Sequence, residues 1–264
     1  MPIIFKKLDS ADDFSQCVDL QRNLFNMSDV DVVSPLMLQL IARENPPMGF
    51  ALGAFDVSEK KQELIGFVMA MAMLHEKSIY GTMIGIKPQY QSLGYGLNLI
   101  LKIREIAIGE NIDYLYGVYE PLDKKLAHLY INHLGFTGTY YQEDVYYLND
   151  ANQKVHIPTD KILFKWDMKA FSDYDKKKNN SKELLQQYPV ATKDEMPDSP
   201  YVFVEIPSDF NLLKKENIEE ALFWRQSTKD IFTHYINHRN FIVYDYLTIK
   251  ETPVKKSFYL LKAQ

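Results

Sequence analysis

One short glycine-containing stretch has the residue types and spacing that most clearly suggest chemistry. Ile84-Gly85-Ile86 is typical of a strand end, and Pro88 stops that strand. Gln91-Ser92-Leu93-Gly94-Tyr95-Gly96 follows, and Leu97 begins a run with apolar residues at helical spacing. Backbone N–H groups at a helix start lack intrahelical partners and carry partial positive charge, so a glycine turn there can bind an anion. A side chain at either glycine of the turn would hold a phosphate away or forbid the turn. The sequence therefore predicts a phosphate-binding loop.

Other interpretations of this loop fit less well. A tight strand-to-helix turn without any ligand would also use two glycines, but the strand, the proline and the periodic helix together favour a ligand. A dinucleotide-binding motif would need a third glycine, and a P-loop would need a Gly-Lys-Ser/Thr ending. Neither is present in residues 91–97.

The pattern Gln-x-x-Gly-x-Gly, preceded by Ile-x-Ile-x-Pro, resembles the acyl-CoA pyrophosphate loop of the GNAT family of acyltransferases. The expected elements of residues 3–168 also follow that family's order: strand, two helices, three strands, helix, strand, helix, two strands. The resemblance implies an α/β (α+β) fold with a mixed central sheet and helices on both faces. A few later residues resemble a poorly characterised bacterial subgroup of predicted acetyltransferases, namely Glu120-Pro121-Leu122, Leu134-Gly135, Pro158-Thr159-Asp160 and Trp166.

The resemblance also implies how acetyl-CoA would bind as a co-substrate. The strand residues Ile84, Gly85 and Ile86 would present backbone groups to the pantetheine arm. The pyrophosphate would be held by Gln91, Ser92, Leu93, Gly94, Tyr95, Gly96 and Leu97. Gln91 stands where the family often has arginine, so one charge-assisted contact is missing while the backbone donors remain.

Such a reaction needs a base for the amine and an acid for the departing thiolate. Tyr130 lies in an Ala-x-x-Tyr segment that resembles the family's late helix, and a phenol with a pKa of about 10 can reprotonate a thiolate. Glu120 ends the strand beside the expected thioester and is the candidate base, with His75 and Glu76 as an alternative. Structural roles stay open for both residues, since amphipathic helices bury tyrosines and loops carry solvated carboxylates.

Composition limits the class of protein. The 264 residues carry a formal net charge of -5, which gives no electrostatic basis for binding nucleic acid or an anionic membrane. The single cysteine, Cys17, excludes an intrachain disulfide and fits a reducing cytoplasm. The longest apolar run, residues 64–74, is too short to span a bilayer, and the start of the sequence has no signal region. We expect a cytoplasmic protein, and we find no metal-ligand spacing.

The chain divides by composition into three parts. We expect a GNAT-like domain at 1–169, a polar linker at 170–200 and an α/β extension at 201–264. The extension's order of strand, helix, strand, strand matches the second half of the GNAT fold, so it is either a degenerate half-repeat or a cover for a sheet edge.

The sequence thus predicts an N-acyltransferase that moves an acetyl group from acetyl-CoA to an amine by direct attack in a ternary complex. One alternative is a non-catalytic acyl-CoA-binding or interaction module on the same scaffold. Another is transfer of a longer acyl or an aminoacyl group. The acceptor and the oligomeric state stay open, because acceptor pockets are built from variable loops.

Overall fold

The computed structural model describes residues 2–45, 47–74, 76–146, 155–170, 174–250 and 255–264. The chain folds into two compact units. The first comprises Met1–Gly117 and Asp167–Lys169, and the second comprises Val118–Trp166 and Ala170–Gln264. None of the described helices is long and apolar enough to cross a membrane.

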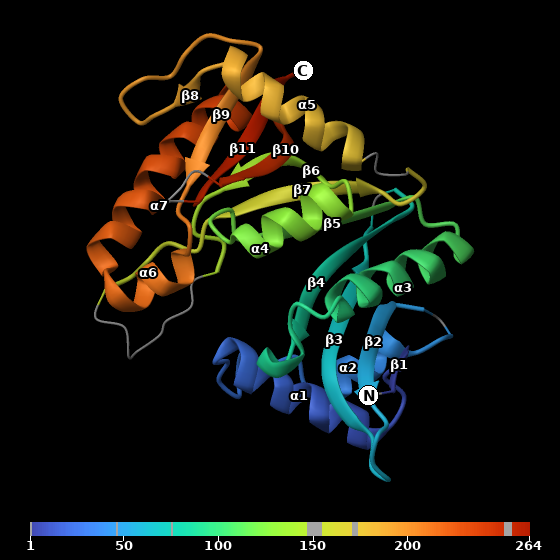
Figure 1. The fold of residues 1–264 in the computed structure, drawn as a ribbon. Coiled ribbons are helices and arrows are strands. Elements are labelled where there is room, and N and C mark those ends of the chain that lie inside the picture. The colour runs from blue at the N-terminus through green and yellow to red at the C-terminus, as the bar shows by residue number, and fades with distance from the viewer. Residues whose placement is uncertain (1, 46, 75, 147–154, 171–173, 251–254) are drawn as a thin grey trace. The chain divides into compact units, whose positions relative to one another are not determined.

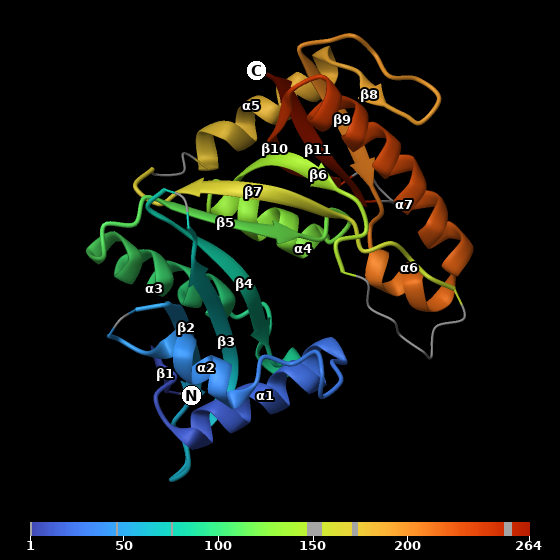
Figure 2. The same cartoon turned by 180° about the vertical axis from the view of Figure 1, so that it is seen from behind.

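The first unit is a mixed sheet with helices on both faces (Figures 1 and 2). Its strands lie in the order β1 (Ile3–Lys7), β2 (Gly49–Asp56), β3 (Glu63–Ala72), β4 (Ser78–Ile86) and β5 (Tyr114–Tyr119), which continues into the second unit. All neighbours are antiparallel except β4 and β5. The helices α1 (Ala11–Phe25) and α2 (Pro35–Ala42) cover one face, and α3 (Tyr95–Gly109) covers the other.

Local sequence signals explain the first two helices. The hydroxyl of Ser10 accepts from the N–H of Asp13, and the hydroxyl of Ser34 accepts from the N–H of Met37 just before a proline at the first helical position. Cys17 is fully buried in the apolar core between these helices and the sheet. Burial raises the pKa of its thiol to about 12, so Cys17 stays a protonated structural thiol.

The second unit combines the end of the expected GNAT domain with the C-terminal extension. Its strands lie in the order β7 (Lys161–Asp167), β6 (Thr137–Gln142), β10 (Phe241–Lys250), β11 (Lys255–Ala263), β9 (Tyr201–Ile206) and β8 (Val190–Ala191). Its helices are α4 (Lys124–Ala127), α5 (Tyr174–Gln187), α6 (Phe210–Glu216) and α7 (Ile218–Phe232). The π-helical segments η2 (His128–His133) and η3 (Thr233–His238) continue α4 and α7.

The segment that we expected to be a polar linker contains a helix. Residues 170–200 include α5 and β8. Leu184, Leu185 and Tyr188 pack against a core cluster that includes Phe203 and Leu260. The charged residues at the start of this segment masked the apolar residues at its end, and burial of those apolar residues stabilises the helix.

Reciprocal hydrogen bonds join the two halves of the second unit. The tetrapeptide Tyr-Ile-Asn-His occurs at 130–133 and again at 235–238, in both cases within a π-helical segment. The amide of Asn132 donates to the carbonyl of Tyr246 at 2.8 Å, and the amide of Asn237 donates to the carbonyl of Tyr141 at 2.8 Å. Tyr246 follows Asn237 by as many residues as Tyr141 follows Asn132. Each half therefore makes the same contact with the other, as the subunits of an isologous dimer do.

The strand pairing repeats in the same way. Gly138 of β6 pairs with Val243 of β10, and these positions are equivalent in the two halves. The ladder of β6 with β7 has a bulge just after Gly138, and the ladder of β10 with β11 has one just after Val243. A left-handed residue precedes each strand, Gly135 with φ 71° and Asn240 with φ 57°.

Candidate functional site

The predicted phosphate loop lies in the first unit, between β4 and α3. After a single 3-10 turn at Pro88–Tyr90, Gly94 forms the N-cap of α3 with φ 85°. No side chain caps α3, and its first turn has no acidic residue. Among the described residues, no acceptor binds the backbone N–H groups of Tyr95, Gly96 and Leu97. These donors, at the positive end of a 15-residue helix, can bind an anion.

The two glycines of the loop differ in whether the backbone conformation requires glycine. Gly94 has a left-handed backbone that L residues rarely adopt, so the turn itself requires glycine there. Gly96 has no such requirement. A Cβ atom added to it would lie 3.8 Å from Cγ1 of Ile86 and 3.9 Å from Cδ1 of Ile84, which is ordinary contact. The chain's own packing therefore leaves room for alanine at position 96.

The strand that leads into the loop has an edge outside its parallel ladder. Pairing of β4 with β5 covers Ser78–Gly81 and Tyr114–Gly117 and ends there. A bulge at Thr82 follows, where the register with β3 shifts. Because bulges redirect backbone groups, Ile84–Ile86 can present N–H and C=O groups to an extended ligand.

The side chain of Gln91 closes the loop. Its amide nitrogen donates to the carbonyl of Ile86 at 3.0 Å, which joins the end of β4 to the turn before α3. The neutral amide therefore stabilises the loop itself, and we still expect the backbone donors to contact the anion.

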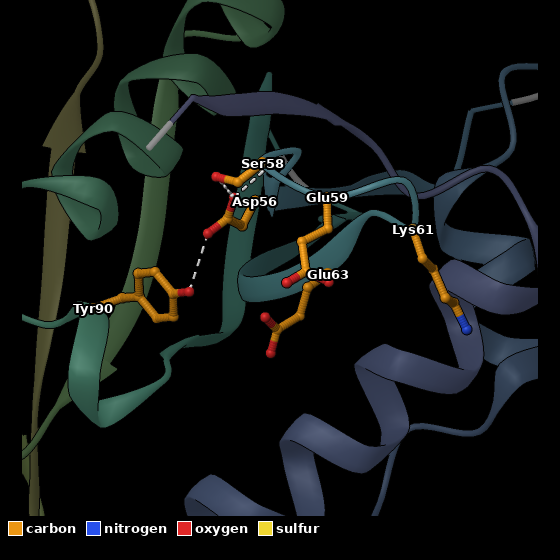
Figure 3. Close-up of a pocket in the computed structure, with 6 residues that line it drawn as sticks. All are labelled: Asp56, Ser58, Glu59, Lys61, Glu63 and Tyr90. Atoms are coloured by element: carbon orange, nitrogen blue, oxygen red, sulfur yellow. Dashed lines mark hydrogen bonds between the residues drawn. The ribbon is translucent and has the colours of Figure 1, made fainter.

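A small pocket lies beside the loop, and a hydrogen bond between two of its lining residues holds the loop in place. The pocket measures about 260 Å³ and is lined by Asp56, Ser58, Glu59, Lys61, Glu63 and Tyr90 (Figure 3). The Tyr90 hydroxyl donates to Oδ2 of Asp56 at 3.1 Å, which ties the 3-10 turn to the end of β2. Three carboxylates and one ammonium line this pocket, so its charge disfavours phosphate. The bond between Tyr90 and Asp56 instead fixes the 3-10 turn of the loop.

Glu120, the candidate base, lies in the second unit and forms a buried ion pair. Nη2 of Arg225 donates to Oε1 at 2.8 Å and to Oε2 at 2.7 Å. The Lys161 ammonium lies 3.5 Å from Oε2, and the N–H of Leu122 donates to Oε1 at 3.1 Å. Burial alone would raise the pKa of Glu120, but Arg225 and Lys161 outweigh it and hold that pKa below its ordinary value. Glu120 is therefore ionised at neutral pH.

Tyr130, the candidate acid, lies in an aromatic cluster of the same unit. Its ring stacks on Phe136 with centroids 5.0 Å apart, and it also contacts Tyr119 and Phe164. Burial raises the pKa of its phenol, so the proton that an acid must give is present at neutral pH.

The alternative base candidates are less well defined. His75 lies outside the described residues. Glu76 accepts a hydrogen bond from the Tyr116 hydroxyl at 3.1 Å. Among the described residues, no group of three or more His, Cys, Asp or Glu side chains could hold a metal ion.

Sequence reasoning missed Arg225, which is the residue in closest contact with Glu120. Its position in α7 gives it no motif, and it lies 105 residues along the chain from Glu120. The repeated Tyr-Ile-Asn-His tetrapeptide was the available signal, because it aligns α7 with the helix that carries Tyr130.

Comparison with known proteins places this fold. Residues 17–136 match the acetyltransferase (GNAT) family. The ribosomal-protein-S18-alanine N-acetyltransferase of Escherichia coli is 13% identical with a TM-score of 0.50, covering 65% of this chain and 97% of that chain. NAA60 of Arabidopsis thaliana in complex with acetyl-CoA is 17% identical with a TM-score of 0.51, covering 64% and 100%. The NatC complex bound to Gag peptide and CoA is 18% identical with a TM-score of 0.51, covering 63% and 99%.

No curated protein matches the chain in sequence. At these identities the solved structures establish the fold. The predicted fold class, a mixed α/β arrangement of the GNAT type, is confirmed.

Proposed function

We propose that this chain, which carries a GNAT acetyltransferase domain, transfers an acetyl group from acetyl-CoA to a primary amine of a small molecule or peptide. The reaction is a direct attack in a ternary complex. The amine nitrogen attacks the thioester carbonyl, the C–S bond breaks, the nitrogen loses a proton and the thiolate gains one. The protein contributes mainly by positioning the two substrates. We expect the chain to act in the cytoplasm, without nucleic acid or membrane as partner.

The geometry of the loop supports a role for each of its residues in this proposal. The N–H groups at the start of α3 bind the pyrophosphate, while Gln91 and Gly94 set the path of the turn. The backbone of Ile84, Gly85 and Ile86 binds the pantetheine arm. In the solved structures of NAA60 and NatC the related fold holds acetyl-CoA and CoA, which supports this assignment.

Two side chains act as general acid and general base in this proposal. Tyr130 protonates the departing thiolate, since an ordinary phenol is protonated at neutral pH. Glu120 accepts a proton from the amine, directly or through one water molecule, since it is ionised at neutral pH.

Gly96 is the observation that carries the proposal. The helix would be more stable with alanine at this position, and nothing in the first unit obstructs a Cβ atom there. Because Gly96 stands at the helix start, beside backbone N–H groups that can bind an anion, close approach of a ligand accounts for glycine there.

The ion pair of Glu120 favours a second candidate function. A carboxylate held by Arg225 and Lys161 has low basicity, and a non-catalytic acyl-CoA-binding module would need no base. The phosphate loop would then serve binding alone.

An assay of thiol release from acetyl-CoA separates these functions. The purified protein is incubated with acetyl-CoA and a panel of amines: N-terminal peptides, amino acids, polyamines and aminoglycosides. We expect amine-dependent release by the wild type and none by Gly94→Glu, whose side chain strains the turn and repels pyrophosphate. Tight binding of acetyl-CoA without release for any amine would instead support the binding module.

A further inference from the structure

Arg225 is a buried cation that the C-terminal extension contributes to the end of β5. Its side chain, on α7, is only 3% exposed. Nη2 alone contacts both carboxylate oxygens of Glu120, and the guanidinium carbon lies 4.8 Å from the centre of the Phe210 ring. Helix α7 belongs to the extension, whereas Glu120 belongs to the segment that we assign to the GNAT domain.

The geometry of the ion pair between Arg225 and Glu120 is not the one expected if its only role were to stabilise the fold. Nε and Nη1 of Arg225 are buried, and neither has a hydrogen-bond partner among the described residues. Burying a guanidinium costs free energy that one shared nitrogen offsets only in part, and an apolar pair of similar volume often stabilises a protein as well. Because two of its buried nitrogen atoms make no hydrogen bond, packing alone does not explain why an arginine occupies position 225.

The groups around Glu120 are cationic on two sides. Arg225 approaches from α7 and Lys161 from β7, while Leu122 donates its backbone N–H. A further acid that interacts with both cations, Asp160, is fully buried and accepts a hydrogen bond from the hydroxyl of Tyr141 at 2.5 Å. Lys161 is itself held by the carbonyl groups of Thr159 and Asp160, each at 3.1 Å.

We propose that Arg225 is a positioning residue that the C-terminal extension supplies to the active site, where it fixes the carboxylate of Glu120 at the end of β5. The inference rests on the proposed function, in which Glu120 accepts a proton from the amine. Arg225 acts through Glu120 and touches neither substrate. The extension is thus part of the catalytic apparatus.

The proposal has a consequence for the pH dependence of the reaction. A base works only when unprotonated, and the cations keep the pKa of Glu120 below its ordinary value. In the wild type, Glu120 therefore stays ionised throughout the neutral range and sets no acid limb there. Without Arg225 the burial remains and one cation is lost, so the pKa rises and the acid limb moves to higher pH.

The test measures the ionisation of Glu120 directly and through activity. Protein labelled with ¹³C at the glutamate carboxyl is titrated by NMR, and Glu120→Gln identifies the resonance. We expect Arg225→Met to raise the proton affinity of Glu120 at least tenfold and Arg225→Lys to raise it less. The acid limb of kcat/KM should move by the same amount. Arg239→Met serves as a control, because Arg239 pairs with Asp198 on the surface.

Folding is monitored by circular dichroism, and Arg225→Lys keeps the test decisive if Arg225→Met does not fold. An unchanged titration and an unchanged pH profile in a folded Arg225 variant would overturn the inference. The Arg225 variants could shift the titration of Glu120 while the wild type binds acetyl-CoA but acetylates no amine. That result would overturn the proposed function instead.

Discussion

Among the single residues of the loop, Gly96 is the one whose identity neither its backbone angle nor its packing explains. Gly94 is explained by its left-handed backbone, and Gln91 by its bond to the carbonyl of Ile86. Gly96 has neither a special backbone angle nor a close neighbour. Glycine is less stable in helices than alanine, by about 1 kcal/mol in a helix interior, and Gly96 stands in the first turn of α3. Such a cost is consistent with a backbone that a ligand must approach.

Tyr130 can be compared with its equivalent in the extension, Tyr235. Both stand first in a Tyr-Ile-Asn-His tetrapeptide, and each ring contacts a phenylalanine six residues later, Phe136 and Phe241. The hydroxyl of Tyr235 donates to the carbonyl of Pro197 at 2.7 Å. The aromatic ring is thus common to both halves, and the function that we propose for Tyr130 concerns its hydroxyl alone.

This comparison supplies a matched pair of variants. Tyr130→Phe should lower kcat about 100-fold or more, as expected for loss of a general acid. Its thermal stability should change little, since the ring and its contacts with Phe136 and Phe164 remain. Tyr235→Phe should keep kcat and lose about 1 kcal/mol of stability with its hydrogen bond. Steady-state kinetics and thermal unfolding check both. Full activity of Tyr130→Phe would leave Tyr130 as a core aromatic residue only.

The sequence was informative at the loop because a strand end, a glycine turn and a helix start are local signals. It predicted where Gln91 and Gly94 lie, and it identified Glu120 and Tyr130 as the candidate catalytic residues. It could not predict that Glu120 pairs with Arg225, because that contact depends on how the extension folds back. Long-range ion pairs have no sequence pattern of their own.

At the scale of elements, the two π-helical segments join the halves of the second unit. Asn237 of η3 makes two hydrogen bonds with the backbone of Tyr141, accepting from its N–H at 2.9 Å and donating to its carbonyl at 2.8 Å. Asn237 therefore supplies hydrogen-bond partners to the backbone of Tyr141, at a position of β6 that β10 does not pair with. Asn132 of η2 donates to the carbonyl of Tyr246, but its own carbonyl oxygen is buried without a partner among the described residues.

The two asparagines should differ in their effect on stability. Asn237→Ala removes two bonds and leaves the Tyr141 backbone unsatisfied, which should cost about 2 to 3 kcal/mol. Asn132→Ala removes the bond to the Tyr246 carbonyl and a longer bond of 3.3 Å to Nδ1 of His128, but it also removes an unsatisfied oxygen, so it should cost about 1 kcal/mol. Urea unfolding measures both, with Asn23→Ala on the exposed face of α1 as control. A larger cost for Asn132→Ala would contradict this account of the contacts.

Elements with strong local signals follow most directly from the sequence, as at α1, where the hydroxyl of Ser10 caps the helix start. The Ala-x-x-Tyr segment was expected to lie in a late helix, and the structure has a short α-helix, α4, followed by the π-helical segment η2. Tertiary contacts of Asn132 with β10 favour the wider turn, and periodicity cannot reveal such contacts. Helix α5 was missed because its charged first half looked like a linker.

At the scale of the whole molecule, we propose that the extension is a degenerate half-repeat of the segment that ends the GNAT domain. The repeated tetrapeptide, the reciprocal asparagine bonds and the equivalent strand bulges support this. The repeated part lies after the phosphate loop in the first copy, so the second copy has no such loop to inherit. The extension then contributes Arg225 rather than a second acyl-CoA site.

The sequence predicted this repeat only as one of two possibilities for residues 201–264. The order of strands and helices suggested it, but an extra helix, α6, separates β9 from α7 and obscures the alignment. The structure reveals it through pairings, such as Gly138 with Val243, that no single sequence shows.

The most direct measurement is calorimetric titration of acetyl-CoA into the wild type, Gly96→Ala and Gly109→Ala. Both variants exchange glycine for alanine in α3 at positions where a Cβ atom makes no close contact, so both should unfold at the wild-type temperature or above. We predict equal affinity for the wild type and Gly109→Ala, and at least tenfold weaker binding by Gly96→Ala. No binding by the wild type, or wild-type affinity in Gly96→Ala, would contradict the claim that the start of α3 holds the acyl-CoA pyrophosphate.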